Sequence, residues 1–437
     1  MSWRGRIAGA VLLGMIAAGH VDAQQPVQAV TLEQAIRLAR AASPTVVTAQ
    51  GSTRAAQLET RSALWQYIPA LTLTPGANLL LSSGQARLDP VTSELISGNQ
   101  STFSYSFGLN ATYTIFDGFM RTYQLRRQRA LEAAANASLT STIFASDYGA
   151  TQAFFAALAD QQLVVVAQSN VASAEAQLKL ATAKLHAGSG RLSDSLTAQG
   201  TYLQSKLGVL QAQSNLVNGE SNLGRLVGMP GRVAALDDST FYRLPPPVDT
   251  AAVRLEVMAS APSLRSLAAN VTAAHEAYKS AKSTYFPTIA VSAGDNWTAN
   301  QENNFTLTPR RSLNLGFSFS PWTSLQRETQ VEEASIEVTD AEVELADQRN
   351  FLAAQVNQVF AALSTAEETI AVTQASVTTG ELNLRIATDQ YRTGVSTITD
   401  VLTAQQQLLS AQGAAVQARY SYLLAKAQLE GIIGRKV

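Results

Sequence analysis

The feature that most constrains the fold is a duplication within the chain. The segment ASPTV around Pro44 recurs as SAPSL around Pro262, 218 positions later, and YIP at 67–69 recurs as YFP at 285–287. Further along, the two halves match at a distance of 206. The matches there are Gly188 with Gly394, Asp194 with Asp400, and the LTAQ of Leu196–Gln199 with that of Leu402–Gln405. Similarity at a fixed distance over a whole half indicates a tandem repeat.

The start of the chain is typical of a secretory signal peptide. Arg4 and Arg6 precede an apolar run over 7–18, and small residues lead up to Ala23. The run has about 12 residues, whereas a membrane anchor needs about 20. We therefore expect a signal peptide over 1–23, cleaved after Ala23, a first repeat over 24–228, a linker over 229–250 and a second repeat over 251–437.

Each repeat is predicted to have the same helices. It opens with a helix of about 35 residues, Thr31–Trp65 or Ala251–Tyr285, ended by the Pro that follows. After the strands come about 70 residues without Pro, Gly118–Ala187 or Trp322–Thr393. As a helix this stretch is about 105 Å long. A turn containing Gly then leads into another helix of about 35 residues, so the two shorter helices stacked end to end match the long one.

The last helix of each repeat has apolar residues every seven positions, which indicates left-handed coiled-coil packing. In the second repeat one line is Val401, Leu408, Ala415, Tyr422 and Leu429, and the next is Leu402, Leu409, Val416 and Leu423. In the first repeat the corresponding lines are Tyr202, Val209, Leu216 and Leu223, and Leu196, Leu203, Leu210 and Val217.

Two strands per repeat are predicted between the helices, because apolar and polar residues alternate there. The clearest case has apolar residues at Phe103, Tyr105, Phe107, Leu109, Ala111, Tyr113 and Ile115. The other strands alternate over 71–81, 289–293 and 313–319. Each strand therefore has one apolar face.

The apolar face has two interpretations: it packs on a soluble core, or it faces lipid while the polar face lines water. A soluble sheet would need apolar helices packed against that face, but the neighbouring helices are rich in Ala and Gln. This favours the interpretation in which the apolar face contacts lipid. Four strands cannot close a membrane barrel, and an open edge in lipid leaves backbone groups unpaired. We therefore expect a barrel shared between chains, of 8 strands in a dimer or 12 in a trimer. The polar loops Gly84–Ser101 and Thr298–Ser312 would face outside.

Composition excludes several classes of function. Net charge is −1, so there is no basic footprint for nucleic acid. With no Cys and three His, the chain has no thiolate metal ligand, no paired His and no Ser–His–acid motif, so we expect no enzyme, cofactor or resident metal. The rival hypothesis is a soluble periplasmic coiled-coil scaffold or adaptor protein, which leaves the four amphipathic strands unexplained.

Several segments together resemble the TolC-like outer-membrane efflux family over nearly the whole mature chain. They are TLEQAIRLARAASP, YIPALTL, YFPTIAVSA, YTIFDG and YRTGVSTITDVLTAQQQLLSAQ. The resemblance implies a mainly α protein with a small membrane β part. It also implies a homotrimer in the outer membrane of a Gram-negative-type cell, in which a 12-stranded β-barrel continues as a 12-helix α-barrel through the periplasm. A periplasmic adaptor and an inner-membrane transporter would supply substrate to this passive duct, for efflux or type I secretion.

The resemblance also implies a gate at the periplasmic tip. The matching residues are Asp194, Asp400 and Tyr391, while Ser396 and Thr403 stand where some members have a gate Arg and a second Asp. Three copies would form rings of like charge around one axis. Each Asp also fits a simpler interpretation, because a carboxylate in the first helical turn complements the helix dipole.

The two turns are the adaptor-docking candidates implied by the resemblance. They contain Gly188, Ser189 and Gly190 in the first repeat and Gly394, Val395 and Ser396 in the second. A plain turn between helices explains the same residues. His186 and His275 lack partners at metal-ligand spacing.

Overall fold

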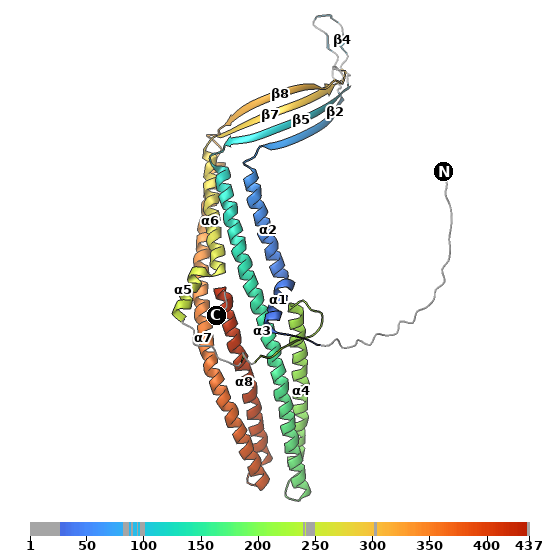
Figure 1. The fold of residues 1–437 in the computed structure, drawn as a ribbon, viewed down its shortest axis with the longest axis vertical. Helices are drawn as coiled ribbons and strands as arrows, with labels where there is room; N and C mark the ends of the chain where they lie inside the picture. The colour runs from blue at the N-terminus through green and yellow to red at the C-terminus, as the bar shows by residue number, and fades with distance from the viewer. Residues whose placement is uncertain are drawn as a thin grey trace, which may run out of the picture.

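The computed structural model describes residues 27–81, 87–88, 91–93, 95–96, 101–238, 241, 250–300 and 304–434. The chain is elongated, with a strand sheet at one end and two helical hairpins at the other (Figure 1). The predicted signal peptide, most of the loop at 84–101 and the prolines at 245–247 lie outside the described residues.

The two halves repeat the same order of elements, as the duplication predicts. The first contains β1 (Gln28–Val30), α1 (Leu32–Ala42), α2 (Pro44–Trp65), β2 (Ala70–Leu81), the short β3 (Arg87–Leu88) and β4 (Leu95–Ile96), β5 (Ser101–Phe116), α3 (Met120–His186) and α4 (Leu192–Leu226). After β6 (Val233–Ala235) come α5 (Thr250–Ser260), α6 (Pro262–Lys282), β7 (Thr288–Asn300), β8 (Thr308–Ser318), α7 (Gln326–Thr393) and α8 (Ile398–Ile433).

The opening helix of each repeat is not continuous, which corrects the prediction. Ser43 and Ala261 have extended backbones, with ψ of 116° and 128°, and Pro44 and Pro262 begin the next helix. A proline clashes with a helical residue before it but suits the first position of a helix. Each expected helix of about 35 residues is therefore a pair, α1 with α2 and α5 with α6.

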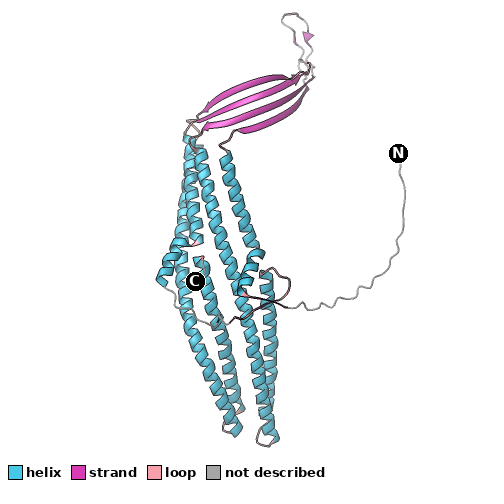
Figure 2. Cartoon of the chain, viewed as in Figure 1, coloured by secondary structure: helices cyan, strands magenta, loops and turns pink. Residues whose placement is uncertain are grey.

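The long helices confirm the prediction that the shorter helices run beside them. Helices α2 and α4 both pack along α3, and α6 and α8 both pack along α7. Figure 2 shows the helices extending from the sheet to the hairpin turns. The two repeats meet because α3 also packs against α6 and α8.

The strands form one antiparallel sheet in the order β2-β5-β7-β8. Strands β7 and β8 extend over 288–300 and 308–318, so most of the expected loop at 298–312 is strand instead. The prediction assigned 298–300 and 308–312 to the loop, because polar and charged residues and a Pro interrupt the apolar alternation there. Strands β2 and β8 are the two edges of the sheet.

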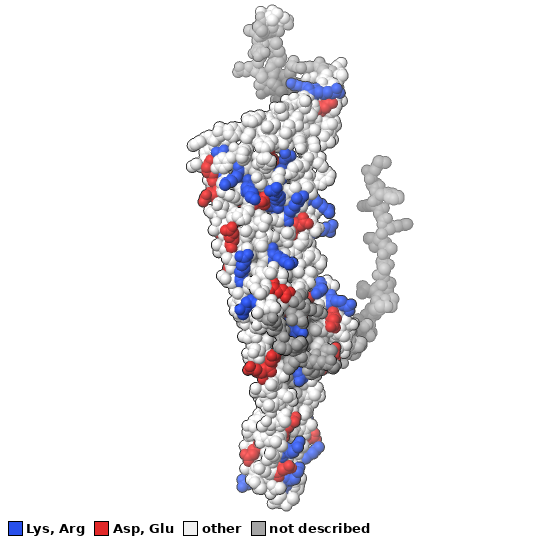
Figure 3. All heavy atoms as spheres, turned by 60° about the vertical axis from the view of Figure 1, so that its left-hand side comes forward, with Lys and Arg blue, Asp and Glu red and all other residues white. Residues whose placement is uncertain are grey.

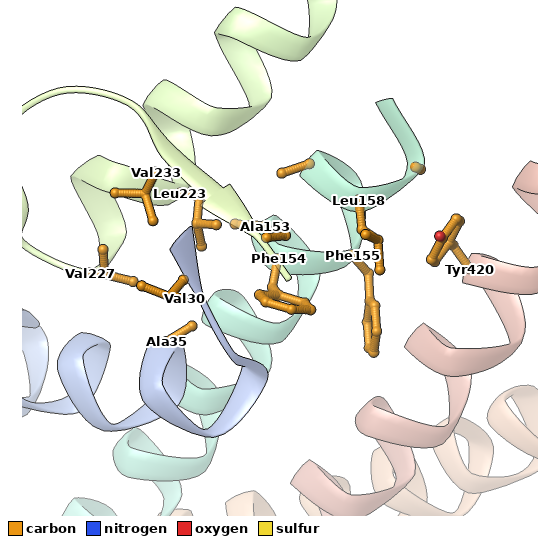
Figure 4. Close-up of a cluster of buried hydrophobic side chains, with 13 residues drawn as sticks. Val30, Ala35, Ala153, Phe154, Phe155, Leu158, Leu223, Val227, Val233 and Tyr420 are labelled. Carbon is orange, nitrogen blue, oxygen red and sulfur yellow. The ribbon is translucent and has the colours of Figure 1, made fainter. Parts of the chain in front are cut away.

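A hydrophobic core lies at mid-height, where three-residue strands that carry no periodic signal pair in parallel. Strand β1 pairs with β6, bringing Val30 and Val233 together with Leu223. Figure 4 shows these residues beside Phe154 and Phe155 of α3, with Tyr420 of α8 on the far side. This core ties the ends of α1 and α4 and both repeats to the middle of α3.

Candidate functional site

Two glycine turns form the end of the molecule farthest from the sheet (Figure 1). Gly188 and Gly394 both have left-handed backbones, with φ of 73° and 87°. Glycine adopts the left-handed conformation at little cost because it has no Cβ, so it is the usual residue at the end of a helix. Val395, which follows Gly394, is 78% exposed. The predicted docking residues thus all lie in these turns, at the tips of two adjacent hairpins.

Asp400 belongs to a complete capping box at the start of α8. Its Oδ2 accepts hydrogen bonds of 2.8 Å from the backbone N–H and from Oγ1 of Thr397, and that Oγ1 accepts one from the N–H of Asp400. The bonds from the backbone and the side chain of Thr397 lower the pKa of Asp400. The simpler interpretation, that Asp400 stabilises a helix start, therefore describes its contacts.

Asp194 makes a different contact, although it is the repeat equivalent of Asp400. It lies half-buried in the first turn of α4, where the hydroxyl of Tyr391 donates a hydrogen bond of 3.5 Å to its Oδ2. Tyr391 is 3% exposed, and burial followed by the charge of Asp194 raises the pKa of its hydroxyl. The bond joins the start of α4 to the end of α7, so it links the two hairpins.

Lys184 is a third member of this site that the sequence analysis missed. Its Nζ donates to the backbone carbonyls of Tyr391 and, at 3.4 Å, Arg392, and it lies 4.6 Å from the centre of the Tyr391 ring. These carbonyls lie at the C-terminal end of α7, where the helix dipole makes a cation favourable. No local pattern marks this lysine, because its partners are about 200 positions away.

Next to these contacts the two hairpins share a small apolar core. It contains Ala181, Ala198, Ala387, Tyr391, Ile398, Val401 and Ala404. Most of these residues are alanines, which allow the helices to approach closely. The contact of Tyr391 with Asp194 therefore lies at the edge of a packed seam between the hairpins.

The second candidate site is the apolar face of the sheet. Residues opposite each other in the register share a face, so Phe103, Tyr105, Phe107, Leu109 and Tyr113 lie on the face of Leu71 and Leu73. Ile115 departs from this pattern, because the ladder shifts there and Phe116, not Ile115, pairs with Ile289. Ile115 thus occupies a β-bulge at the helical end of the strand.

The same face carries few charges. Strands β2 and β5 have none, and Asp295 of β7 pairs at 3.3 Å with Arg311 of β8 on the apolar side. Figure 3 shows an uncharged band across the sheet, between charges near its far end and those on the helices. The band matches the apolar girdle of a membrane barrel.

The described residues contain no group of three His, Cys, Asp or Glu side chains that could hold a metal ion. Within the described part of the chain, α3 is long and apolar enough to cross a membrane by length and composition alone. Half of its most apolar window is buried inside the protein, as in a core helix.

Comparisons with known proteins agree along almost the whole length. Residues 35–229 and 254–435 match the family described as outer membrane efflux protein. The chain is 22% identical over 334 residues to the outer membrane efflux protein BepC of Brucella suis, which covers 75% of this chain and 72% of BepC. It is 24% identical over 424 residues to the pyoverdine export outer membrane protein OpmQ of Pseudomonas putida, covering 92% and 85% of the two chains.

The fold is similar to a solved outer membrane protein. The structure of VceC from Vibrio cholerae superposes with a TM-score of 0.77, covering 93% of this chain and 96% of VceC at 17% identity. The residues that match the family include both repeats, the sheet and both hairpin turns. The chain belongs to the outer membrane efflux protein family.

Proposed function

We propose that three copies of this chain form the outer-membrane exit duct of a tripartite efflux or type I secretion system, with a gate at the hairpin tips. The family membership establishes an outer-membrane efflux duct that extends into the periplasm. The number of copies, the adaptor and transporter partners and the gate residues are our proposal.

The observation that carries the proposal is a four-stranded sheet with one apolar face and two edges. On β8, Leu313, Leu315 and Phe317 are 76%, 72% and 69% exposed in the single chain. A membrane barrel needs at least about 8 strands and no open edge. Three copies supply 12 strands, the number that the family resemblance implies.

A second unpartnered surface supports association along the helices. Leu196, Leu203, Leu210 and Val217 form one heptad line on α4, and they are 57%, 53%, 61% and 37% exposed. The equivalent line on α8 is half-buried within the chain. A heptad line favours contact with another helix, and we assign that contact on α4 to a neighbouring copy.

The proposed gate consists of Asp194, Tyr391 and Lys184. Together they connect the start of α4 to the end of α7 across the tip. Breaking this connection frees one hairpin to move relative to the other, which widens the tip. Asp400 is assigned to helix capping, because Thr397 already occupies its carboxylate.

The two turns are the proposed surface for the periplasmic adaptor. Val395, in the second turn, and Leu192, the first residue of α4 after the first turn, are 78% and 61% exposed. Small apolar groups on a protruding tip fit a helical partner better than a charged ligand. The rival scaffold hypothesis is not favoured, because the family consists of outer membrane proteins.

The test is insertion into planar bilayers with matched variants of one strand. The wild-type protein should produce stepwise current increments. Leu313→Asp places a charge on the apolar face and should abolish insertion, since a charged residue on the lipid face of a membrane barrel is destabilising. Asn314→Asp, one residue along on the opposite face, should still insert. Equal insertion of both variants would contradict the lipid-facing assignment.

A further inference from the structure

The four strands of the sheet carry one acidic and two basic side chains, Asp295 on β7 and Arg310 and Arg311 on β8. Asp295 and Arg311 lie on the apolar face, where they form an ion pair of 3.3 Å. Successive side chains of a strand point to opposite faces, so Arg310 lies on the polar face. Since the only carboxylate of the four strands is on the other face, none of them balances the charge of Arg310.

The neighbours of Arg310 on the polar face are uncharged hydrogen-bonding groups. Asn296 lies opposite it on β7, and Ser312 follows two residues later on β8. These side chains converge with Asn110 over Gly294. A Cβ at Gly294 would lie 3.2 Å from both Nδ2 of Asn296 and Oγ of Ser312, and 2.6 Å from Oδ1 of Asn110. The guanidinium, the amide nitrogen and the hydroxyl are all donors, which suits an anion.

Arg310 lies near the end of the sheet that is farthest from the helices. It is the third residue of β8, whose last residue, Ser318, pairs with Thr288 at the helical end of β7. Figure 3 shows charged side chains near this far end, beyond the uncharged band. In the proposed duct this level is the outer mouth, which cargo reaches after it has passed the hairpin tips.

We propose that the three Arg310 side chains of the assembled duct form a cationic ring near its outer mouth, which favours cargo carrying carboxylate or phosphate groups over cations. This inference rests on the proposed trimer, in which the polar face of the sheet lines the lumen. Guanidinium binds both of these anionic groups in a planar, two-pronged geometry and stays charged at any physiological pH.

The size of a shared barrel makes such a ring effective. Twelve strands about 4.8 Å apart and tilted by about 40° give a barrel radius of about 12 Å. A long arginine side chain reaches inward from that wall, so the lumen at this level lies within about one Debye length of a guanidinium, about 10 Å at 0.1 M salt. The three fields therefore overlap across the lumen, where they attract anions and repel cations.

The test is the reversal potential of single channels in planar bilayers, in a gradient of potassium glutamate near 0.1 M. This potential gives the permeability ratio of glutamate, whose charge is carried by carboxylates, to potassium. Arg310→Gln should lower the ratio by about three- to tenfold, because three charges leave the lumen. Arg310→Glu should lower it further, and Arg310→Lys should keep it near the wild-type value. The tips are the same in all of these channels, so their charges do not affect the comparison.

A second variant tests the ring while Arg310 stays in place. Asn296→Asp puts a carboxylate opposite Arg310 on the polar face and should lower the ratio as Arg310→Gln does. It carries the test if Arg310→Gln fails to insert. The matched control is Asp295→Asn with Arg311→Gln, which removes the ion pair on the apolar face and should leave the ratio unchanged.

Salt concentration gives an independent check on the same channels. At 1 M salt the Debye length falls to about 3 Å, so the difference between wild type and Arg310→Gln should disappear. A difference that persists at 1 M would contradict a long-range effect of the ring charge.

The outcomes separate the ring from the duct itself. Stepwise currents from Arg310→Gln with the permeability ratio of the wild type would overturn the ring and leave the duct intact. An equal shift in the control pair would also overturn the ring, because the shift would then not depend on the polar face. If no form of the protein produces current steps, wild type included, the proposed duct fails and the ring with it.

Discussion

At the scale of single residues, the two repeat-equivalent aspartates differ because their helices begin differently. The residue before α8 is Thr397, whose hydroxyl completes a capping box with Asp400. The equivalent residue before α4 is Arg191, which has no acceptor and makes no side-chain cap. Asp194 is therefore left to accept the hydroxyl of Tyr391 across the hairpins. The difference between Thr397 and Arg191 at the two helix starts therefore distinguishes Asp400, which caps its helix, from Asp194, the candidate gate carboxylate.

Removing the hydroxyl of Tyr391 should loosen the tip. Tyr391→Phe keeps the buried ring but loses the bond to Asp194, so we expect a larger conductance or open fraction in planar bilayers, by about two- to tenfold for a bond worth about 0.5–1.5 kcal/mol. Asp194→Asn should act in the same direction. Asp400→Asn is the matched control and should leave the conductance unchanged. A response to Asp400→Asn equal to that of Asp194→Asn would contradict the assignment.

Lys184 should hold the tip through the carbonyls at the end of α7. Lys184→Met keeps the length of the side chain but loses both donated bonds and the contact with the Tyr391 ring, so it should raise the open fraction. Lys184→Arg retains a cation and donors and should stay closer to wild type. Single-channel recordings of the two variants measure this difference. Identical behaviour of Met and Arg variants would show that the cation is not needed.

At the scale of elements, regular patterns made most of the fold predictable. Alternation with period two located the strands, the absence of Pro located α3 and α7, and heptads located α4 and α8. The breaks at Pro44 and Pro262 were missed, because both prolines served only as markers of the duplication and not as starts of a new helix. The pairing of β1 with β6 was missed because three residues carry no period.

The candidate site was less predictable than the fold. Asp194, Asp400 and Tyr391 were named from a family resemblance, but their different contacts depend on tertiary structure. Lys184 gives no signal because its partners lie at the end of another helix. The bulge at Ile115 depends on the register with β7, which a single strand does not encode.

The exposed heptad line of α4 should stabilise the assembly more than the single chain. Leu203→Ala with Leu210→Ala removes apolar surface that the chain itself leaves exposed, so each change should cost the trimer on the order of 2 kcal/mol per seam. The readout is the trimer fraction against detergent concentration, with helicity unchanged by circular dichroism. Gln204→Ala with Gln211→Ala, on a neighbouring line, is the control. Equal loss in both variants would remove this line from the seam.

At the scale of the whole molecule, a single chain leaves its sheet edges and apolar surfaces uncovered. One end is a sheet with an apolar face and two open edges, the other is a pair of hairpins, and the middle is tied by the core around Phe154. Because of the duplication, one side of each copy belongs to the first repeat and the other side to the equivalent second repeat. Copies can therefore pack side by side as the two repeats pack within one chain, and so close a ring. A duct follows from this arrangement because the polar face of the sheet is then enclosed.

The central claim is that several chains share one membrane barrel, and native mass tests it most directly. Protein extracted from outer membranes in mild detergent should contain three chains per particle, and it should require detergent to stay in solution. Single chains that are stable in detergent, or particles that dissolve without detergent, would contradict the account, because the apolar face and the open edges would then be covered within one chain.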